Sequence, residues 1–257
     1  MYKRIIPTLL LDANGFYKTR FFKNPSYVGD PVNIIRIFNE KEVDEVNIID
    51  IGLSKKNNPL NLKLIENIAS ESFMPMSYGG GILSLEDAEK IFSFGIEKIS
   101  FNQAIFHNPK LIRECSKRFG AQSIVANVNL KKDFFKRLRL FDYKLNKLYK
   151  KNFSEYFDYL KLLGFGEIYL NIVDREGSLL GPDIEIADEF LKLSSLPMVY
   201  NGGISSINDI KSIFDLGFDA VSAGAFFIYS GPHRAVLISY PQADKLLKCG
   251  VKLYKGN

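Results

Sequence analysis

The chain has 257 residues, of which 46% are hydrophobic, with 34 Lys and Arg against 29 Asp and Glu. This hydrophobic share suffices for one packed core, which excludes a disordered chain, and a barrel of this length can be one domain, 1–257. No apolar run reaches 18 residues, and the first apolar stretch is too short for a signal peptide, so we expect no membrane span. Two isolated cysteines and two histidines without ligand spacing predict a cytoplasmic protein that has no metal and no cofactor.

Short apolar runs alternate with amphipathic stretches along the chain. Several runs are apolar throughout, as expected of parallel strands that are covered on both faces. Two amphipathic stretches, 84–94 and 208–216, have helical spacing and are each followed by a glycine. Eight strands alternating with helices favour an α/β fold, a (β/α)8 TIM barrel, over an open doubly wound sheet. The predicted strands are 4–11, 45–51, 73–78, 98–102, 123–130, 167–173, 197–201 and 220–224.

The segment 78–106 is repeated at 200–228. The offset is 122 residues, and ten of the 29 aligned positions are identical. A repeat of this length exceeds a solenoid unit, which spans roughly 20–50 residues. It indicates instead a barrel built from two similar half-barrels, each carrying the same glycine-rich turn after a strand.

Small residues end or follow the strands in both copies of the repeat. They let backbone N–H groups approach an oxyanion closely, and the N-terminus of a following helix adds a favourable dipole. Glycines that merely permit tight turns are the other interpretation, but the duplication favours a phosphorylated small-molecule substrate with a phosphate at each end. The predicted phosphate-binding residues are Gly80, Gly81, Asn102, Gly202, Gly203, Ala223 and Gly224.

Few carboxylates lie near the expected mouth of the barrel. Asp12 follows the first predicted strand, Asp50 ends the second, and Asp174 and Glu176 follow the sixth. At the end of the fifth strand stands Asn129, which can form hydrogen bonds but cannot usefully take a proton near neutral pH. The candidate catalytic residues are Asp12, Asp50, Asp174 and Asn129, whereas Glu176 is not selected; the aspartates could instead cap loops or pair with basic side chains.

One segment, 131–151, is strongly basic. It has nine Lys and Arg against two Asp, a net charge of +7, which leaves −2 for the rest of the chain. Its alternation of apolar and charged residues predicts a hairpin-like, two-stranded excursion. Such a patch could meet nucleic acid or lie over an anionic substrate. On balance we expect no nucleic-acid partner.

Seven motifs occur in a fixed order: KRII at 3–6, GDPV at 29–32, DEVNIIDI at 44–51, YGGGI at 78–82, EKISFN at 97–102, GEIYLNIVDREG at 166–177 and NGGI at 201–204. Through them the chain resembles the cyclase subunit of imidazole glycerol phosphate synthase over nearly its whole length. The resemblance implies a two-half barrel that takes ammonia from a glutaminase docked at the barrel bottom. The ammonia would pass through the barrel to a two-phosphate ribulosyl substrate, which is cyclised and cleaved.

The resemblance also assigns roles to single residues. It implies that a ring of four charges, Arg4, Glu45, Lys98 and Glu167, guards the ammonia entrance. It places Lys18 in a mobile first loop and adds Gly177 to the phosphate turns. Four charges inside a barrel are costly unless they pair with one another, so their presence predicts an entrance that is still in use.

The chain departs from this family at the two catalytic aspartates, whose positions fall on Leu10 and Asn129. Losing one proton-transfer group typically costs about 10²–10⁴-fold in rate, so weak cyclase activity is expected. Asp12 could substitute only if the first strand were shifted by two residues. The LLL-type first strand resembles a paralogue group found with surface-polysaccharide genes. Its members accompany a glutaminase and a sugar amidotransferase that install an acetamidino group.

Three functions are therefore considered. The first is an ammonia-receiving synthase subunit that has diverged towards amidination of a surface-glycan sugar, which accounts for both the retained entrance and the altered mouth. The second is a genuine cyclase of histidine biosynthesis that makes imidazole glycerol phosphate, with an aspartate at another position replacing the missing pair. The third is a non-catalytic scaffold that activates the glutaminase. The first two are enzymes, and we favour the first.

Overall fold

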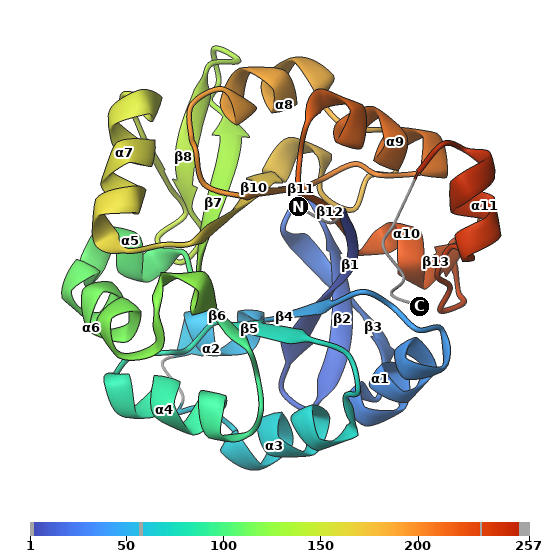
Figure 1. The fold of residues 1–257 in the computed structure, drawn as a ribbon, viewed down its shortest axis with the longest axis horizontal. Helices are drawn as coiled ribbons and strands as arrows, with labels where there is room; N and C mark the ends of the chain where they lie inside the picture. The colour runs from blue at the N-terminus through green and yellow to red at the C-terminus, as the bar shows by residue number, and fades with distance from the viewer. Residues whose placement is uncertain (1–2, 57–58, 232, 252–257) are drawn as a thin grey trace.

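The computed structural model describes residues 3–56, 59–231 and 233–251. Eight parallel strands close into a barrel with an outer layer of helices (Figure 1). The last barrel strand pairs with the first, and Arg4 lies beside Ala220. The predicted (β/α)8 fold is therefore confirmed. The barrel strands, in order around the barrel, are β1 (Arg4–Asp12), β4 (Val46–Asp50), β5 (Met76–Gly79), β6 (Lys98–Phe101), β7 (Ile124–Lys132), β10 (Glu167–Ile172), β11 (Met198–Asn201) and β12 (Ala220–Ala223).

The first and fifth barrel strands, β1 and β7, extend beyond the barrel and form antiparallel hairpins. The extension of β1 pairs with β2 (Gly15–Arg20), which pairs with β3 (Lys23–Gly29). The extension of β7 pairs with β8 (Leu138–Asp142), which pairs with β9 (Lys147–Tyr149). The excursion predicted at 131–151 is thus present as strands, whereas the β2–β3 hairpin was not predicted.

The helices that cover the barrel begin with clear capping signals in both halves. The side chains of Ser84 and Ser206 each accept a hydrogen bond from the aspartate three residues on, and that aspartate caps in return. The repeat in the sequence is therefore also a repeat of the helix starts that follow the glycine turns. The helices are α1 (Pro31–Glu40), α2 (Ile51–Lys56), α3 (Leu62–Glu71), α4 (Leu85–Ser93), α5 (Gln103–His107), α6 (Pro109–Phe119), α7 (Phe153–Leu163), α8 (Ile184–Leu191), α9 (Ile207–Leu216), α10 (Ala225–Ile228) and α11 (Ala243–Lys248).

The hydrophobic core has two parts. The larger part fills the space between the outer faces of the strands and the helices. A small separate cluster fills the inside of the barrel and consists of Ile6, Val125, Tyr169, Val199 and Ala220. Because side chains alternate across a strand, the residues two positions away also point inward, so this cluster separates a lower layer from an upper one. Within the described residues, no helix is long and apolar enough to cross a membrane.

Candidate active site

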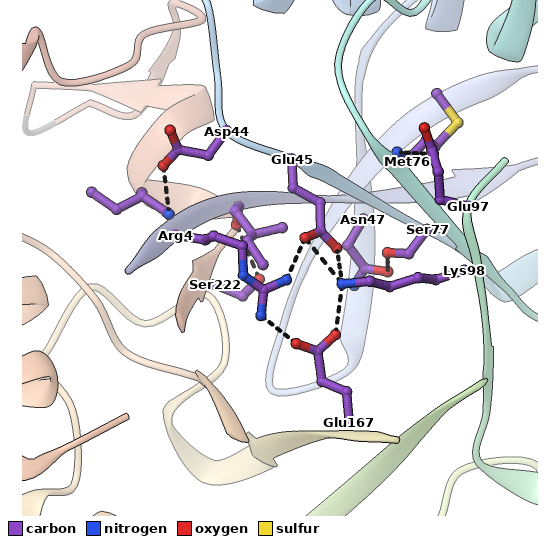
Figure 2. Close-up of polar contacts among 12 residues, drawn as sticks. Arg4, Asp44, Glu45, Asn47, Met76, Ser77, Glu97, Lys98, Glu167 and Ser222 are labelled. Carbon is purple, nitrogen blue, oxygen red and sulfur yellow. Dashed lines mark hydrogen bonds and ion pairs between the residues drawn. The ribbon is translucent and has the colours of Figure 1, made fainter. Parts of the chain in front are cut away.

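Four charged side chains close the bottom of the barrel in a ring (Figure 2). The guanidinium of Arg4 donates hydrogen bonds to both Glu45 and Glu167. On the other side, Lys98 Nζ lies 3.2 Å from both carboxylate oxygens of Glu45 and 2.9 Å from Glu167 Oε2. Each cation therefore contacts both anions, and the ring has no net charge. The four residues that the resemblance assigned to the entrance lie together here.

Mutual pairing keeps the ring charged although it is largely buried. The side chains of Glu45 and Glu167 are 3% and 6% exposed. Burial alone would raise the pKa of Glu167, but the charges of Lys98 and Arg4 outweigh it and hold that pKa below its ordinary value. Removing one member would leave a buried charge without compensation, which is far more costly than the intact ring.

Above the ring and the apolar cluster lies a layer of neutral polar side chains. On one side, Ser77 Oγ donates to Asn47 Oδ1 over 2.9 Å, and Asn47 Nδ2 donates to Thr8 Oγ1 over 3.2 Å. The hydroxyl of Thr8 also shares a hydrogen bond with Ser222. These groups are buried and satisfied by one another, so they form a fixed, uncharged floor for the mouth.

The opposite side of the mouth carries a chain of asparagines. Asn201 Nδ2 donates to Asn171 Oδ1, and Asn171 Nδ2 donates to Asn129 Oδ1, each over 2.9 Å. Nearby, Asn127 Nδ2 donates to Ser100 Oγ over 2.8 Å. Amides can orient a ligand by hydrogen bonds but do not take up or release a proton at neutral pH. This wall can therefore form hydrogen bonds with a ligand but cannot act as an acid or a base.

A cavity of about 280 Å³ opens above these layers, and both Leu10 and Asn129 line it. In the described part of the chain, Glu176 is the one carboxylate among the lining residues. Glu176 forms an ion pair with Lys18, accepts a hydrogen bond from Thr19 Oγ1 at 3.0 Å and another from the backbone N–H of Phe22 at 3.3 Å. The β2–β3 hairpin is thereby held over the mouth.

The ion pair with Glu176 also contains a lysine whose pKa is shifted. Burial, with a smaller effect from the charge of Arg234, lowers the pKa of Lys18 from 10.5 to about 7. The neighbouring carboxylate of Glu176 opposes this shift because it favours the ammonium form. A lysine balanced in this way beside a cavity can exchange a proton near neutral pH.

Glycine turns flank the cavity on two sides. Gly80 and Gly203 have φ values of +102° and +86°. A Cβ atom at Gly80 would lie 2.2 Å from the carbonyl oxygen of Asp50, and one at Gly203 would lie 2.1 Å from that of Gly181. Only glycine fits these positions, and both turns expose backbone at the mouth. Gly80, Gly81 and Asn102 line the main cavity, and Gly177, Gly202, Gly203, Ala223 and Gly224 line a smaller pocket beside it.

Comparison with known proteins agrees with this geometry. Residues 4–233 match the family model described as histidine biosynthesis protein. The chain is 44% identical to a Pseudomonas aeruginosa protein provisionally named imidazole glycerol phosphate synthase subunit hisF2, over 95% of this chain and 98% of that protein. It is 35% identical to the imidazole glycerol phosphate synthase subunit HisF of Helicobacter hepaticus, over 93% and 95% of the two chains. The chain belongs to the histidine biosynthesis family, as a divergent HisF-type barrel.

The three candidate aspartates of this HisF-type barrel do not line its cavity. Strand β1 pairs with β4 so that Leu10 lies opposite Ile49, and the shift that would bring Asp12 into the place of Leu10 is not observed. Asp12 lies instead against Gly52, where an added Cβ would be 2.3 Å from its Oδ1. Asp174 is exposed, and its Oδ2 accepts a hydrogen bond from the backbone N–H of Lys132 at 2.7 Å. A catalytic role for any of them stays a prediction.

Asp50 is buried just outside the cavity. One of its oxygens accepts hydrogen bonds from the backbone N–H groups of Gly52 and Leu53 at 3.1 Å, and the other accepts one from the Tyr78 hydroxyl at 3.2 Å. Burial and, more weakly, the charge of Asp12 raise the pKa of Asp50 from 3.8 to about 6, against these hydrogen bonds. The side chain of Asp50 therefore caps the start of α2, and its carbonyl oxygen lies against Gly80 in the first glycine turn.

The structure also shows functional candidates that sequence reasoning did not select. Glu176 precedes a predicted phosphate-binding glycine, so its position in the motif could have indicated it. His107 lines the cavity, and its Nε2 lies 2.8 Å from Oδ2 of the fully buried Asp142. No local signal connects two residues from α5 and the distant strand β8. Among the described residues, no cluster of three His, Cys, Asp or Glu could hold a metal ion.

Proposed function

We propose that this chain is the ammonia-receiving synthase subunit of a glutamine-dependent complex. Its glutaminase partner would dock at the barrel bottom, and the mouth would present a phosphorylated acceptor to the ammonia. The observation that carries this proposal is the contrast along the barrel axis. A complete ring of paired charges lies below a mouth lined by Leu10 and Asn129, the two positions that the resemblance assigns to the acid–base groups.

The ring suits the passage of ammonia because its two positive and two negative side chains cancel to a net charge of zero. A continuous circle of ion pairs has no attraction for a free cation, and breaking one contact opens it locally without exposing a lone charge to the interior. Both cations and both anions that the resemblance implies are present, although well-packed apolar side chains could close a barrel equally well. Their retention supports a passage that is used.

The mouth suits an acceptor that needs to be held rather than deprotonated. Its polar wall is mainly amides and hydroxyls, and the ionisable side chains among the described lining residues are those of Lys18, His107, Tyr143, Lys144 and Glu176. The glycine turns on two sides fit an acceptor with a phosphate at each end. In the finer form of the proposal, nitrogen is used to convert an acetamido group of a surface-glycan sugar into an acetamidino group. A sugar amidotransferase would activate the carbonyl oxygen with a nucleoside triphosphate, and that oxygen would leave as phosphate when ammonia replaces it.

A second candidate, a genuine cyclase that makes imidazole glycerol phosphate, is favoured by the same two glycine turns. In that case the Lys18 and Glu176 pair would have to supply the proton transfers. The two candidates differ sharply in rate, because two missing proton carriers cost at least about 10²-fold.

The test uses the complex of this chain with its glutaminase and the two-phosphate ribulosyl substrate. With ammonium salt as the nitrogen source, we expect turnover at least about 10²-fold below that of an ordinary cyclase. Turnover near the ordinary rate would favour the cyclase. Stimulated glutamine hydrolysis with no nitrogen transferred to any acceptor would favour a scaffold.

The entrance is tested by Lys98→Met, which leaves the two buried carboxylates with Arg4 as their remaining ring partner. We expect less product per glutamine hydrolysed, because the passage is disturbed, while ammonium-driven product is unchanged. Arg36→Met, which removes an exposed ion pair with Glu71, is the matched control. Unchanged coupling in Lys98→Met would contradict passage through the ring.

A further inference from the structure

The hydroxyl of Tyr169 is a polar group buried inside the barrel. Tyr169 lies in β10 two residues after Glu167, so its side chain points inward as that of Glu167 does, and it is 1% exposed. Within the described part of the chain, its hydroxyl oxygen forms no hydrogen bond of ordinary geometry, and Ser77 is its one weak hydrogen-bonding neighbour. By contrast, the buried hydroxyl of Tyr78 donates to Asp50, and that of Tyr200 accepts from the N–H of Asp183 at 2.8 Å.

The Tyr169 hydroxyl lies between the charged ring and the polar layer. The ring residues Glu45, Glu167 and Arg4 are close enough to act on Tyr169 electrostatically. On the other side is Ser77, whose own hydroxyl donates to Asn47 Oδ1. The remaining neighbours in this layer are apolar: Ile6, Val125, Val199 and Ala220. Tyr169 is thus the polar member of an otherwise apolar layer that any molecule moving along the axis must cross.

An unpaired buried hydroxyl destabilises a fold, because the group loses its bonds to water and gains none. Phenylalanine would fill the same space without this cost. Because its contact with Ser77 is weak, the hydroxyl in this place can still take up a further hydrogen-bond partner. Burial and the nearby carboxylates raise the pKa of Tyr169 well above its ordinary value, so the phenol stays protonated and able to donate.

We infer that the Tyr169 hydroxyl is the relay that carries neutral ammonia from the charged ring to the Ser77–Asn47 side of the polar layer. This inference rests on the proposed function. The hydroxyl donates a hydrogen bond to the lone pair of ammonia, and its oxygen can accept a hydrogen bond from one of the N–H groups of ammonia. No covalent bond is broken and no proton is transferred. Ammonium has no lone pair to accept this bond, and its charge would be poorly solvated among four apolar side chains. The layer therefore passes the neutral form.

The first experiment needs neither the acceptor nor the glutaminase. The chain is labelled with ¹³C at the tyrosine ring carbon that bears the hydroxyl, and the Tyr169 signal is assigned with Tyr169→Phe. Ammonium chloride is titrated at neutral and at alkaline pH, with sodium chloride as the control salt. We expect a saturable shift of the Tyr169 signal that grows with pH as neutral ammonia increases. No shift at alkaline pH, or an equal shift with sodium chloride, would overturn the relay.

The second experiment compares Tyr169→Phe with Tyr200→Phe, which removes a partnered hydroxyl outside the barrel axis. We expect Tyr169→Phe to melt at the same or a higher temperature than the wild type, and Tyr200→Phe to melt at a lower one. In the complex, Tyr169→Phe should lose at least half of the product formed per glutamine hydrolysed, with ammonium-driven product unchanged. Full coupling in this variant would reject the relay.

The two proposals fail in different ways. If the wild type transfers no nitrogen from ammonium salt, the proposed function fails for this acceptor, while the shift of the Tyr169 signal still decides the relay. If the wild type couples glutamine hydrolysis to product and the Tyr169→Phe complex does so equally well, the relay fails and the proposed function stands.

Discussion

The two ends of this barrel have opposite chemistry. At the bottom, four formal charges are buried and fully paired, and at the mouth the strand ends carry amides, hydroxyls and a leucine. Both ends are built from the same strands, since Arg4 and Leu10 are six residues apart in β1. The comparison teaches that one set of strands can carry paired charges at its start and neutral side chains at its end.

The largest effect is expected from restoring the missing charges at the mouth. Leu10→Asp with Asn129→Asp places two carboxylates in the cavity lining. If the rest of the mouth still fits the ribulosyl substrate, cyclase turnover with ammonium salt should rise about 10²–10⁴-fold. Leu10→Asn in the otherwise unchanged chain is the uncharged control. Absence of any gain would show that the mouth has diverged at more than these two positions.

The next effect is expected from breaking the charge balance at the bottom. Arg4→Met leaves two buried carboxylates that share Lys98. We expect the free energy of unfolding to fall by about 3 kcal/mol, because an uncompensated buried charge remains. Denaturant unfolding at neutral pH measures it, and the double variant Arg4→Met, Glu167→Gln should recover part of the loss. A loss no larger than that of Arg36→Met would mean that the ring does not stabilise the barrel.

The smallest effect is expected from pH, and its sign differs between the two ends. The pKa of Asp50 is raised from 3.8 to about 6, so its contribution to stability is present below the lower value and is lost as the pH rises to the upper one. The change is at most about 1.4 kcal/mol per pH unit, which is less than the loss expected of Arg4→Met. The pKa of Glu167 is lowered, so its contribution is present at neutral pH and is lost in acid.

Unfolding curves at pH values across this window would test the difference. Relative to wild type, Asp50→Asn should gain stability as the pH rises, and Glu167→Gln should lose it. If both variants followed the wild-type pH dependence, neither carboxyl would have the shifted pKa described above.

Much of this arrangement could be predicted from the sequence, because it is encoded locally. Unbroken apolar runs gave the barrel strands, and the duplicated glycine turns gave the two halves. The β2–β3 hairpin could not be predicted, because its turn holds Phe21 and Phe22 at positive φ, and phenylalanine gives no turn signal. The third strand was predicted too long, since Phe73, although apolar, is 88% exposed before the strand begins.

The cavity wall was harder to predict because its contacts join distant segments. Lys18 was expected in a mobile loop, but nothing in the sequence shows that it reaches Glu176 across 158 residues. The same holds for His107 and Asp142, which meet only because β7 continues into an extra hairpin. Patterns along a chain indicate which face a side chain occupies, whereas pairing across the mouth depends on how the loops fold over it.

The asparagine chain at the mouth has a direction. Each amide nitrogen points to the next amide oxygen, from Asn201 through Asn171 to Asn129, whose oxygen is already engaged. The run thus ends on an amide nitrogen, which can only donate. A ligand can accept a hydrogen bond from this amide nitrogen if a carbonyl or ether oxygen faces Asn129. A ligand N–H in the same place would form no hydrogen bond with it, because both groups are donors. An aspartate in the same place would accept hydrogen bonds and would favour a ligand N–H there. The amide of Asn129 therefore decides which edge of a ligand can face this wall.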